Sequence, residues 1–267
     1  MIRLLYPDMA DDEEHLCHLI FDAEPEPAIS EREWVAAPLP DCTLYLEPLQ
    51  AFVWGSSLHL ARWLLTNRDV VSGRSVAELG AGTGLPSLCA RIAGARSVVG
   101  SDYDATAMAA LSRAAQYNNI DCLQAVQLDW FDALRPGFAV AHDPVEVMLV
   151  ADCNYYTRAL DGLLATVLAY LLPGGTLLLA SRVDRCSLHE FLERLQLHAA
   201  FSLTQSVIFR EGDSQAIPVE SVNTSKNDDC HNSAASTSQL VHQMWIFARA
   251  NTIQGEPANR GSYELGT

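Results

Sequence analysis

Short apolar runs alternate with helical patterns through residues 51–210, and this alternation constrains the fold more than any other feature of the chain. The strand-like runs are residues 75–79, 97–100, 122–128, 145–151 and 176–180. The helical patterns are residues 85–92, 106–117, 160–172 and 188–199. Strands that alternate with helices form βαβ units, in which the strands are parallel and helices cover both faces of the sheet. The sequence therefore predicts a doubly wound α/β domain with a mostly parallel, Rossmann-like sheet.

Two later strand-like runs, residues 201–209 and 240–248, complete the predicted sheet. They are separated by residues 211–239, which are polar and nearly free of large apolar side chains, so we expect a flexible insert there. The two runs then form a closing antiparallel strand pair. With this pair the expected sheet has seven strands.

The expected domain organisation is one folded domain at residues 51–250 with a polar tail at 251–267. Residues 1–50 are rich in Asp, Glu and Pro, and we interpret them as an acidic N-terminal extension. One short strand is expected within this extension, at Thr43–Leu46.

The charge balance bears on possible partners. Lys and Arg number 17 against 33 Asp and Glu, which gives a formal net charge of −16 at pH 7. An acidic surface repels nucleic-acid backbones and attracts basic partners, although it also serves simple solubility. We therefore expect a protein partner with a basic patch and no nucleic acid.

The sequence offers little for a membrane, a disulfide framework or a metal. The longest apolar stretch, residues 163–172, is far shorter than the roughly 20 residues of a membrane span. The seven cysteines are odd in number and never spaced C-x-x-C, which is typical of reduced thiols rather than of disulfides or a zinc site. The first residues show no secretory-signal pattern. We expect a cytoplasmic or nuclear protein without a metal centre or a membrane contact.

A glycine loop is the sharpest local motif: it reads Glu78-Leu79-Gly80-Ala81-Gly82-Thr83-Gly84-Leu85-Pro86. Glycines let the backbone turn tightly and approach a ligand, and the following helix presents free N–H groups. A dinucleotide-binding loop has the pattern G-x-G-x-x-G, whereas Leu85 stands at the last of these positions here. The acidic Glu78 before the first glycine also disfavours a pyrophosphate. Both departures favour a cofactor without phosphate groups.

Acidic residues end the second and third predicted strands. Asp102 stands where a doubly wound fold presents a carboxylate to ribose hydroxyls. The alternative role for Asp102 is a helix N-cap, but Asp104 already offers that cap. Asp129-Trp130 follows the third strand. The indole of Trp130 either lies on an adenine face or fills the core, and the pair alone does not decide between these roles.

Five motifs together resemble a known family. They are Val53-Trp54-Gly55-Ser56-Ser57, the glycine loop, Ser101-Asp102-Tyr103, Leu128-Asp129-Trp130 and Ala151-Asp152-Cys153-Asn154-Tyr155. Their order and spacing resemble the seven-β-strand S-adenosylmethionine-dependent methyltransferases. More narrowly, the chain is similar to the methyltransferase-16 group, which contains many protein-lysine methyltransferases. The similarity covers residues 45–210 and the final strand.

The resemblance implies S-adenosyl-L-methionine as the cofactor. The implied cofactor-binding residues are Trp54 over the methionine end, Gly80, Ala81 and Gly82 in the loop beneath it, Asp102 at the ribose, Trp130 at the adenine, and Ala151 through its backbone. The run from Asp152 to Tyr155 matches the D-x-x-Y/F signature of the group, which implies Asp152 and Tyr155 as catalytic residues. Gly55 departs from many members of the group, and the insert at 211–239 is unusually long.

The implied chemistry needs a well-positioned, deprotonated nucleophile, because the sulfonium already activates the methyl group. A neighbouring sulfonium lowers the pKa of a lysine amine, since like charges disfavour the charged form. Asp152 would orient the amine, and the ring of Tyr155 or Tyr156 would wall the channel and attract a cation. The structural alternatives are a helix cap near Thr157 for Asp152 and simple packing for Tyr155.

The favoured function is a monomeric protein-lysine N-methyltransferase. Enzymes that methylate an exocyclic base nitrogen usually carry an N/D-P-P-aromatic tetrad, and Cys153-Asn154 replaces Pro-Pro here. Two alternatives stay open: a small-molecule N-methyltransferase, and a cofactor-binding scaffold without catalysis.

Overall fold

A computed structural model gives the structure of the chain. It describes residues 35–39, 42–47, 53–154, 156–210, 217–219 and 241–251.

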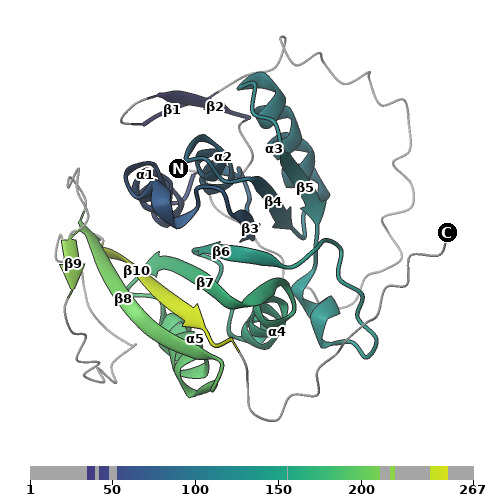
Figure 1. Ribbon diagram of the computed structural model, residues 1–267, viewed down its shortest axis with the longest axis vertical. Coiled ribbons are helices and arrows are strands. Elements are labelled where there is room, and N and C mark those ends of the chain that lie inside the picture. The colour runs from purple at the N-terminus through teal and green to yellow at the C-terminus, as the bar shows by residue number, and fades with distance from the viewer. Residues whose placement is uncertain are drawn as a thin grey trace, which may run out of the picture. The chain divides into compact units, whose positions relative to one another are not determined.

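An eight-stranded sheet forms the centre of the domain, in the order β5-β4-β3-β6-β7-β10-β8-β9 (Figure 1). Its strands are β3 (Ser75–Leu79), β4 (Ser97–Asp102), β5 (Leu123–Gln127), β6 (Val145–Ala151), β7 (Leu171–Arg182), β8 (Phe201–Arg210), β9 (Ile217–Val219) and β10 (Val241–Arg249). Strands β3 to β7 are parallel to one another. Strand β10 lies antiparallel between β7 and β8. The predicted α/β class, the parallel sheet and the closing antiparallel pair are confirmed.

Strand β9 is an addition to the prediction, because it falls within the range expected to be a flexible insert. It pairs antiparallel with β8 at the edge of the sheet. Its sequence is Ile-Pro-Val, and an edge strand tolerates a proline because one side of its backbone needs no partner. The remainder of residues 211–239 lies outside the described residues.

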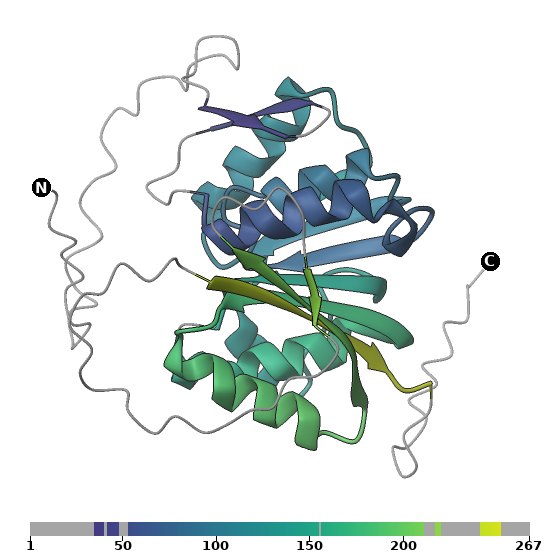
Figure 2. The ribbon, with the colours of Figure 1, turned by 90° about the vertical axis from the view of Figure 1, so that its left-hand side faces the viewer.

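Helices cover both faces of the sheet, as Figure 2 shows. On one face lie α1 (Gly55–Thr66), α2 (Leu85–Ile92) and α3 (Ala105–Tyr117); on the other lie α4 (Leu160–Tyr170) and α5 (Cys186–Leu197). Short 3-10 turns are η2 (Arg68–Val70), η3 (Trp130–Leu134) and η4 (Thr157–Ala159). Helix α1 is not among the predicted helices. It begins after Trp54 without a side-chain cap, so the usual start signal is missing.

A two-stranded antiparallel hairpin precedes the sheet, formed by β1 (Val35–Pro38) and β2 (Thr43–Leu46). The strand predicted at Thr43–Leu46 is therefore confirmed. The buried Leu44 and Leu46 belong to one apolar cluster with Leu111 of α3 and with residues of α2. Part of the range interpreted as an acidic extension thus packs with the domain.

The central strand β6 positions the site. Six of its seven residues are buried, as expected for a parallel strand covered on both faces. Because the chain order reverses between β3 and β6, the carboxyl ends of these two strands mark the topological switch point, where open α/β sheets bind ligands. In the part of the chain that the structure describes, no helix is long and apolar enough to cross a membrane.

Candidate functional site

The glycine loop leaves the carboxyl end of β3 with three left-handed glycines, at φ of +65° for Gly80, +51° for Gly82 and +74° for Gly84. A Cβ on Gly80 would lie 2.5 Å from the Cys153 Sγ, and one on Gly84 would overlap the side chain of Leu111. A Cβ on Gly82 would meet no atom of the described residues within 4 Å. The loop is therefore packed against protein at both ends and open at its centre.

Asp102 closes this loop from the end of β4. Its Oδ2 accepts the Gly82 N–H at 2.9 Å, and its Oδ1 accepts the Asp104 N–H at 3.1 Å. Burial raises the pKa of Asp102, although these two N–H groups act in the opposite direction. The N-cap of α3 is Asp104, whose carboxylate accepts the Thr106 N–H at 2.8 Å. The capping alternative for Asp102 is therefore wrong.

Trp130 stands beside the same loop, after β5. Asp129 caps η3 by accepting the Phe131 N–H at 3.0 Å, which fixes the start of that turn. The indole of Trp130 is half-buried, and its edge would lie 3.2 Å from a Cβ on Gly80. Trp130 thus packs against a buried apolar cluster while remaining partly accessible.

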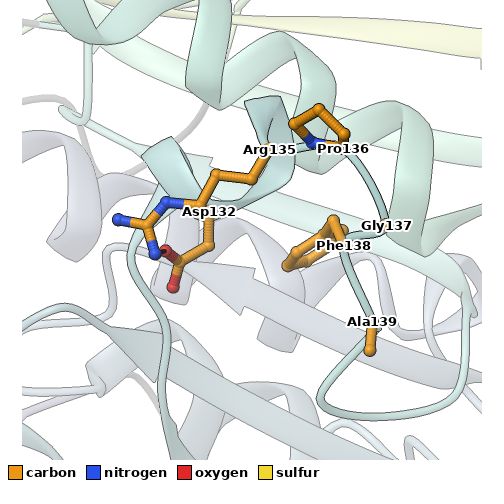
Figure 3. Close-up of a pocket in the computed structure, with 6 residues that line it drawn as sticks. All are labelled: Asp132, Arg135, Pro136, Gly137, Phe138 and Ala139. Atoms are coloured by element: carbon orange, nitrogen blue, oxygen red, sulfur yellow. Dashed lines mark ion pairs between the residues drawn. The ribbon is translucent and has the colours of Figure 1, made fainter.

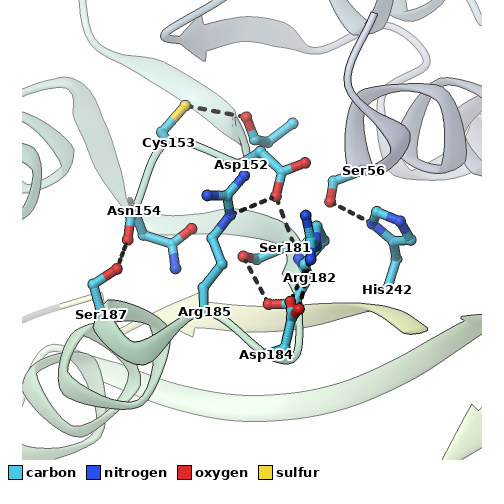
Figure 4. A network of polar contacts seen from close by, with 11 residues as sticks. Ser56, Asp152, Cys153, Asn154, Ser181, Arg182, Asp184, Arg185, Ser187 and His242 are labelled. Atoms are coloured by element: carbon cyan, nitrogen blue, oxygen red, sulfur yellow. Dashed lines mark hydrogen bonds and ion pairs between the residues drawn. The ribbon is translucent and has the colours of Figure 1, made fainter. Parts of the chain in front are cut away.

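The end of β6 carries the most unusual carboxylate. Asp152 is only 3% exposed and has a left-handed backbone, at φ +54°. Its Oδ1 accepts the Arg182 N–H at 3.3 Å and the Arg185 Nε–H at 3.4 Å (Figure 4). Its Oδ2 is buried and has no hydrogen-bond partner among the described residues. A buried carboxylate oxygen without a partner is costly, so this atom indicates a place for a ligand donor.

The helix-cap alternative for Asp152 is wrong. The residue that precedes η4 is Tyr156, and no side chain caps that turn. Ala151, the last residue of β6, is buried beside Asp152. Tyr155, the second implied catalytic residue, lies outside the described residues. Its neighbour Tyr156 is 47% exposed and lies under the guanidinium of Arg158.

Trp54 immediately precedes α1 and is 52% exposed, with the Arg185 guanidinium carbon 5.6 Å from the centre of its ring. The structure explains why glycine stands at position 55, where the family pattern has another residue. A Cβ at this position would lie 2.6 Å from the imidazole of His242 on β10. The same imidazole shares a hydrogen bond of 2.8 Å with the hydroxyl of Ser56.

The sequence motifs did not predict two features of the candidate site. Arg185 lies 33 residues beyond its partner Asp152, and only the pairing of β6 with β7 brings the two together. Asn154 lies inside the recognised signature, yet its side-chain amide is fully buried without a partner among the described residues. Its backbone oxygen accepts the Ser187 hydroxyl. No signal in the sequence announces either arrangement.

Glu78, at the end of β3, lies fully buried beneath the loop. One of its carboxylate oxygens accepts the backbone N–H of Ser87 at 2.9 Å and the hydroxyl of Ser87 at 2.5 Å. Burial raises the pKa of Glu78 from its ordinary value of 4.5 to about 8, against the effect of these hydrogen bonds. The carboxyl group therefore ties β3 to the first turn of α2.

Glu78→Gln is expected to flatten the pH dependence of stability between about pH 4.5 and pH 8. A carboxyl group whose pKa is higher in the folded state holds its proton there while the unfolded chain has lost it. Its stabilising contribution is therefore complete below pH 4.5 and is lost as the pH rises through 8. The check is the thermal unfolding midpoint of both proteins across this window. A variant as pH-sensitive as the wild type would contradict the assignment.

A cavity of about 290 Å³ lies after η3 (Figure 3). Its lining consists of Asp132, Arg135, Pro136, Gly137, Phe138 and Ala139. None of the residues implicated above belongs to this lining. Within the described residues, no group of His, Cys, Asp and Glu side chains is arranged to hold a metal ion.

Comparison with known proteins identifies relatives over part of the chain. The model of the lysine methyltransferase family (Methyltransf_16) matches residues 46–198, more than half of the chain. The electron transfer flavoprotein beta subunit lysine methyltransferase of Danio rerio is 30% identical over 170 residues, which make up 63% of this chain and 63% of the relative. Protein-lysine N-methyltransferase EFM3 of Chaetomium thermophilum is 33% identical over 138 residues, 48% of this chain and 41% of the relative. The chain thus matches less than two thirds of the length of either relative.

A solved structure shares the fold. It is the T. thermophilus 16S rRNA N2 G1207 methyltransferase RsmC, in complex with AdoMet and guanosine. The TM-score is 0.53 at 20% identity, and the match covers 86% of this chain and 53% of that one. At this identity the likeness supports the Rossmann-like methyltransferase fold and nothing further.

Proposed function

Because the chain belongs to the lysine methyltransferase family, we propose that it transfers a methyl group from S-adenosyl-L-methionine to a lysine side chain of a protein. The observation that carries this proposal is the Oδ2 of Asp152, which has no hydrogen-bond partner among the described residues and lies at the switch point beside the glycine loop. The names of the two curated relatives, both protein-lysine methyltransferases, support the choice of a lysine.

The residues around the glycine loop fit the cofactor. Gly82 leaves open space at the centre of the loop, and the carboxylate of Asp102 at its side suits the two ribose hydroxyls. Trp130 would contact the adenine, and Trp54 and the backbone of Ala151 would contact the methionine end. When bound, S-adenosyl-L-methionine supplies a methyl group on a positively charged sulfur.

The chain itself would bind and orient the nucleophile. A neutral lysine amine has two N–H groups and one lone pair, and Asp152 Oδ2 would accept one N–H so that the lone pair points to the methyl carbon. With the cofactor held by the glycine loop, Asp102 and Trp130, a new N–C bond would form as the C–S bond breaks, and the electron pair of that bond would stay on sulfur. Two effects would lower the barrier. The fixed position of Asp152 would orient the amine, and its burial would keep water away from the reacting groups.

Asp102→Asn is expected to weaken cofactor binding by about 10- to 100-fold, because charge-assisted hydrogen bonds to the ribose become neutral ones. Calorimetric titration with S-adenosyl-L-methionine measures the change. Asp104→Asn is the matched control, since asparagine caps a helix as well as aspartate does and should leave the affinity unchanged. Equal affinity of Asp102→Asn and the wild type would remove Asp102 from the ribose site.

The substrate proposed here is a protein with a basic patch, because the chain carries a net charge of −16 and would attract such a surface. The same charge disfavours nucleic acid. We place the enzyme in the cytoplasm or the nucleus, acting as a monomer. These proposals extend beyond what the names of the relatives say.

The test is transfer of labelled methyl groups into a cell extract, separated on a gel, with Asp152→Ala in parallel. One or a few protein bands labelled by the wild type alone, with methyl-lysine found by mass spectrometry, are the expected result. Label confined to small molecules would overturn the protein-lysine function in favour of a small-molecule N-methyltransferase. Cofactor binding without any transfer would favour a scaffold.

A further inference from the structure

Arg185 contacts two residues of the candidate site, Asp152 and Trp54. Its Nε donates to Asp152 Oδ1 at 3.4 Å, and its guanidinium carbon lies 5.6 Å from the centre of the Trp54 ring. Asp152 is 3% exposed and the Arg185 side chain is 20% exposed, so water reaches the pair only from the arginine side. Because Arg185 and the Arg182 N–H both bind Oδ1, Oδ2, which has no partner in the part of the chain that the structure describes, is the oxygen left for a substrate.

An isolated carboxylate beside the target amine would oppose the reaction. Asp152 alone would stabilise the lysine ammonium and raise the pKa of the amine, so that the proton that must leave would be held more tightly. The guanidinium of Arg185 makes the pair neutral overall. Oδ2 can then orient an N–H while exerting little net attraction for the extra proton.

We infer that Arg185 is a positioning residue, which holds Asp152 in place and offsets its charge so that the bound amine loses its proton near neutral pH. This inference rests on the proposed lysine methylation. Arg185 does not contact the amine in this arrangement, because it acts on the amine through Asp152.

Other titratable or charged groups lie near Asp152 on β7, α1 and β10. The Arg182 guanidinium pairs with Asp184, at 3.0 Å from Nε to Oδ1. On α1, burial lowers the pKa of His59 to about 4, so this imidazole is neutral at pH 7. On β10, the imidazole of His242 bonds to the hydroxyl of Ser56. Among the described residues, Arg185 contributes the cationic side-chain contact to the Asp152 carboxylate.

The experiment measures the initial rate of label transfer into the wild-type band at saturating S-adenosyl-L-methionine, from about pH 6 to pH 10. The acid limb of the pH–rate profile is the range in which the rate rises with pH as the amine loses its proton. In Arg185→Gln this limb should shift to higher pH by about one to two pH units, because one positive charge near the amine is lost. The rate at pH 7 then falls by about 10- to 100-fold and recovers at high pH. Arg185→Lys should keep a limb close to that of the wild type.

Arg194→Gln is the matched control, because it removes a cation of α5 that pairs instead with Asp161 and Glu190. The acid limb of the Arg194→Gln profile should stay at the pH of the wild type. Calorimetry with S-adenosyl-L-methionine and thermal unfolding establish that each variant is folded. A uniform loss of rate at every pH in Arg185→Gln, or a limb displaced in Arg185→Lys as well, overturns the inference. A wild type that labels no protein overturns the proposed function and the inference with it.

Discussion

Asp152→Asn is expected to slow methyl transfer by at least about 100-fold while cofactor affinity stays within about twofold of the wild type. The reason lies in the two donors that face Oδ1, the Arg182 N–H and the Arg185 Nε–H. An asparagine would turn its oxygen toward these donors, which places its NH₂ group at the position of Oδ2. The amine would then face a donor in place of an acceptor.

The measurement is the initial rate of label transfer into the wild-type protein band, with calorimetry for cofactor binding. Asp184→Asn is the matched control: it changes a nearby exposed carboxylate that pairs with the Arg182 guanidinium. This control should keep at least about half of the wild-type rate, as an exposed pair contributes little. An Asp152→Asn enzyme with the wild-type rate would show that Oδ2 does not hold the amine.

The strands around the site could be predicted closely because their signals are local. β3 and β6 begin and end where the apolar runs do, at Ser75–Leu79 and Val145–Ala151, since each run is bounded by residues that turn or end a strand. The N-cap at Asp104 was predictable for the same reason, as its carboxylate bonds to an N–H two residues away. Local chemistry of this kind needs no knowledge of the partner strands.

The electrostatic design of the site could not be predicted, because it depends on contacts distant in sequence. The approach of Arg185 to Asp152 follows from the register in which Ala151 pairs with Ala180. From the sequence alone, Gly55 is only a departure from the family pattern. The structure explains it, because β10 places His242 where a Cβ of residue 55 would lie. The buried Asn154 amide likewise depends on the loop after β6 as it meets α5. The motifs therefore predict where the candidate site lies, whereas the pairing of strands determines which charges meet there.

Alanine at Gly84 should lower stability more than alanine at Gly82 does, whereas alanine at Gly82 should weaken cofactor binding more. At Gly84, φ is +74° and the new methyl group would overlap Leu111, which is fully buried. Backbone strain and overpacking together should lower the free energy of unfolding by about 2–4 kcal/mol. At Gly82, φ is +51° but no atom of the described residues lies within 4 Å, so the loss should be only about 1–2 kcal/mol.

Cofactor affinity should follow the reverse order. The Cβ of Gly82→Ala points into the open centre of the loop, where we place S-adenosyl-L-methionine, and should raise the Kd by at least about 10-fold, because binding would require the loop or the ligand to shift. Denaturant unfolding measures the first effect and calorimetric titration of the folded protein the second. Wild-type affinity in Gly82→Ala would contradict the placement of the cofactor, whereas wild-type stability in Gly84→Ala would contradict the packing of the loop on α3. Since the two substitutions are two residues apart and add the same methyl group, a difference between them reflects what each glycine faces.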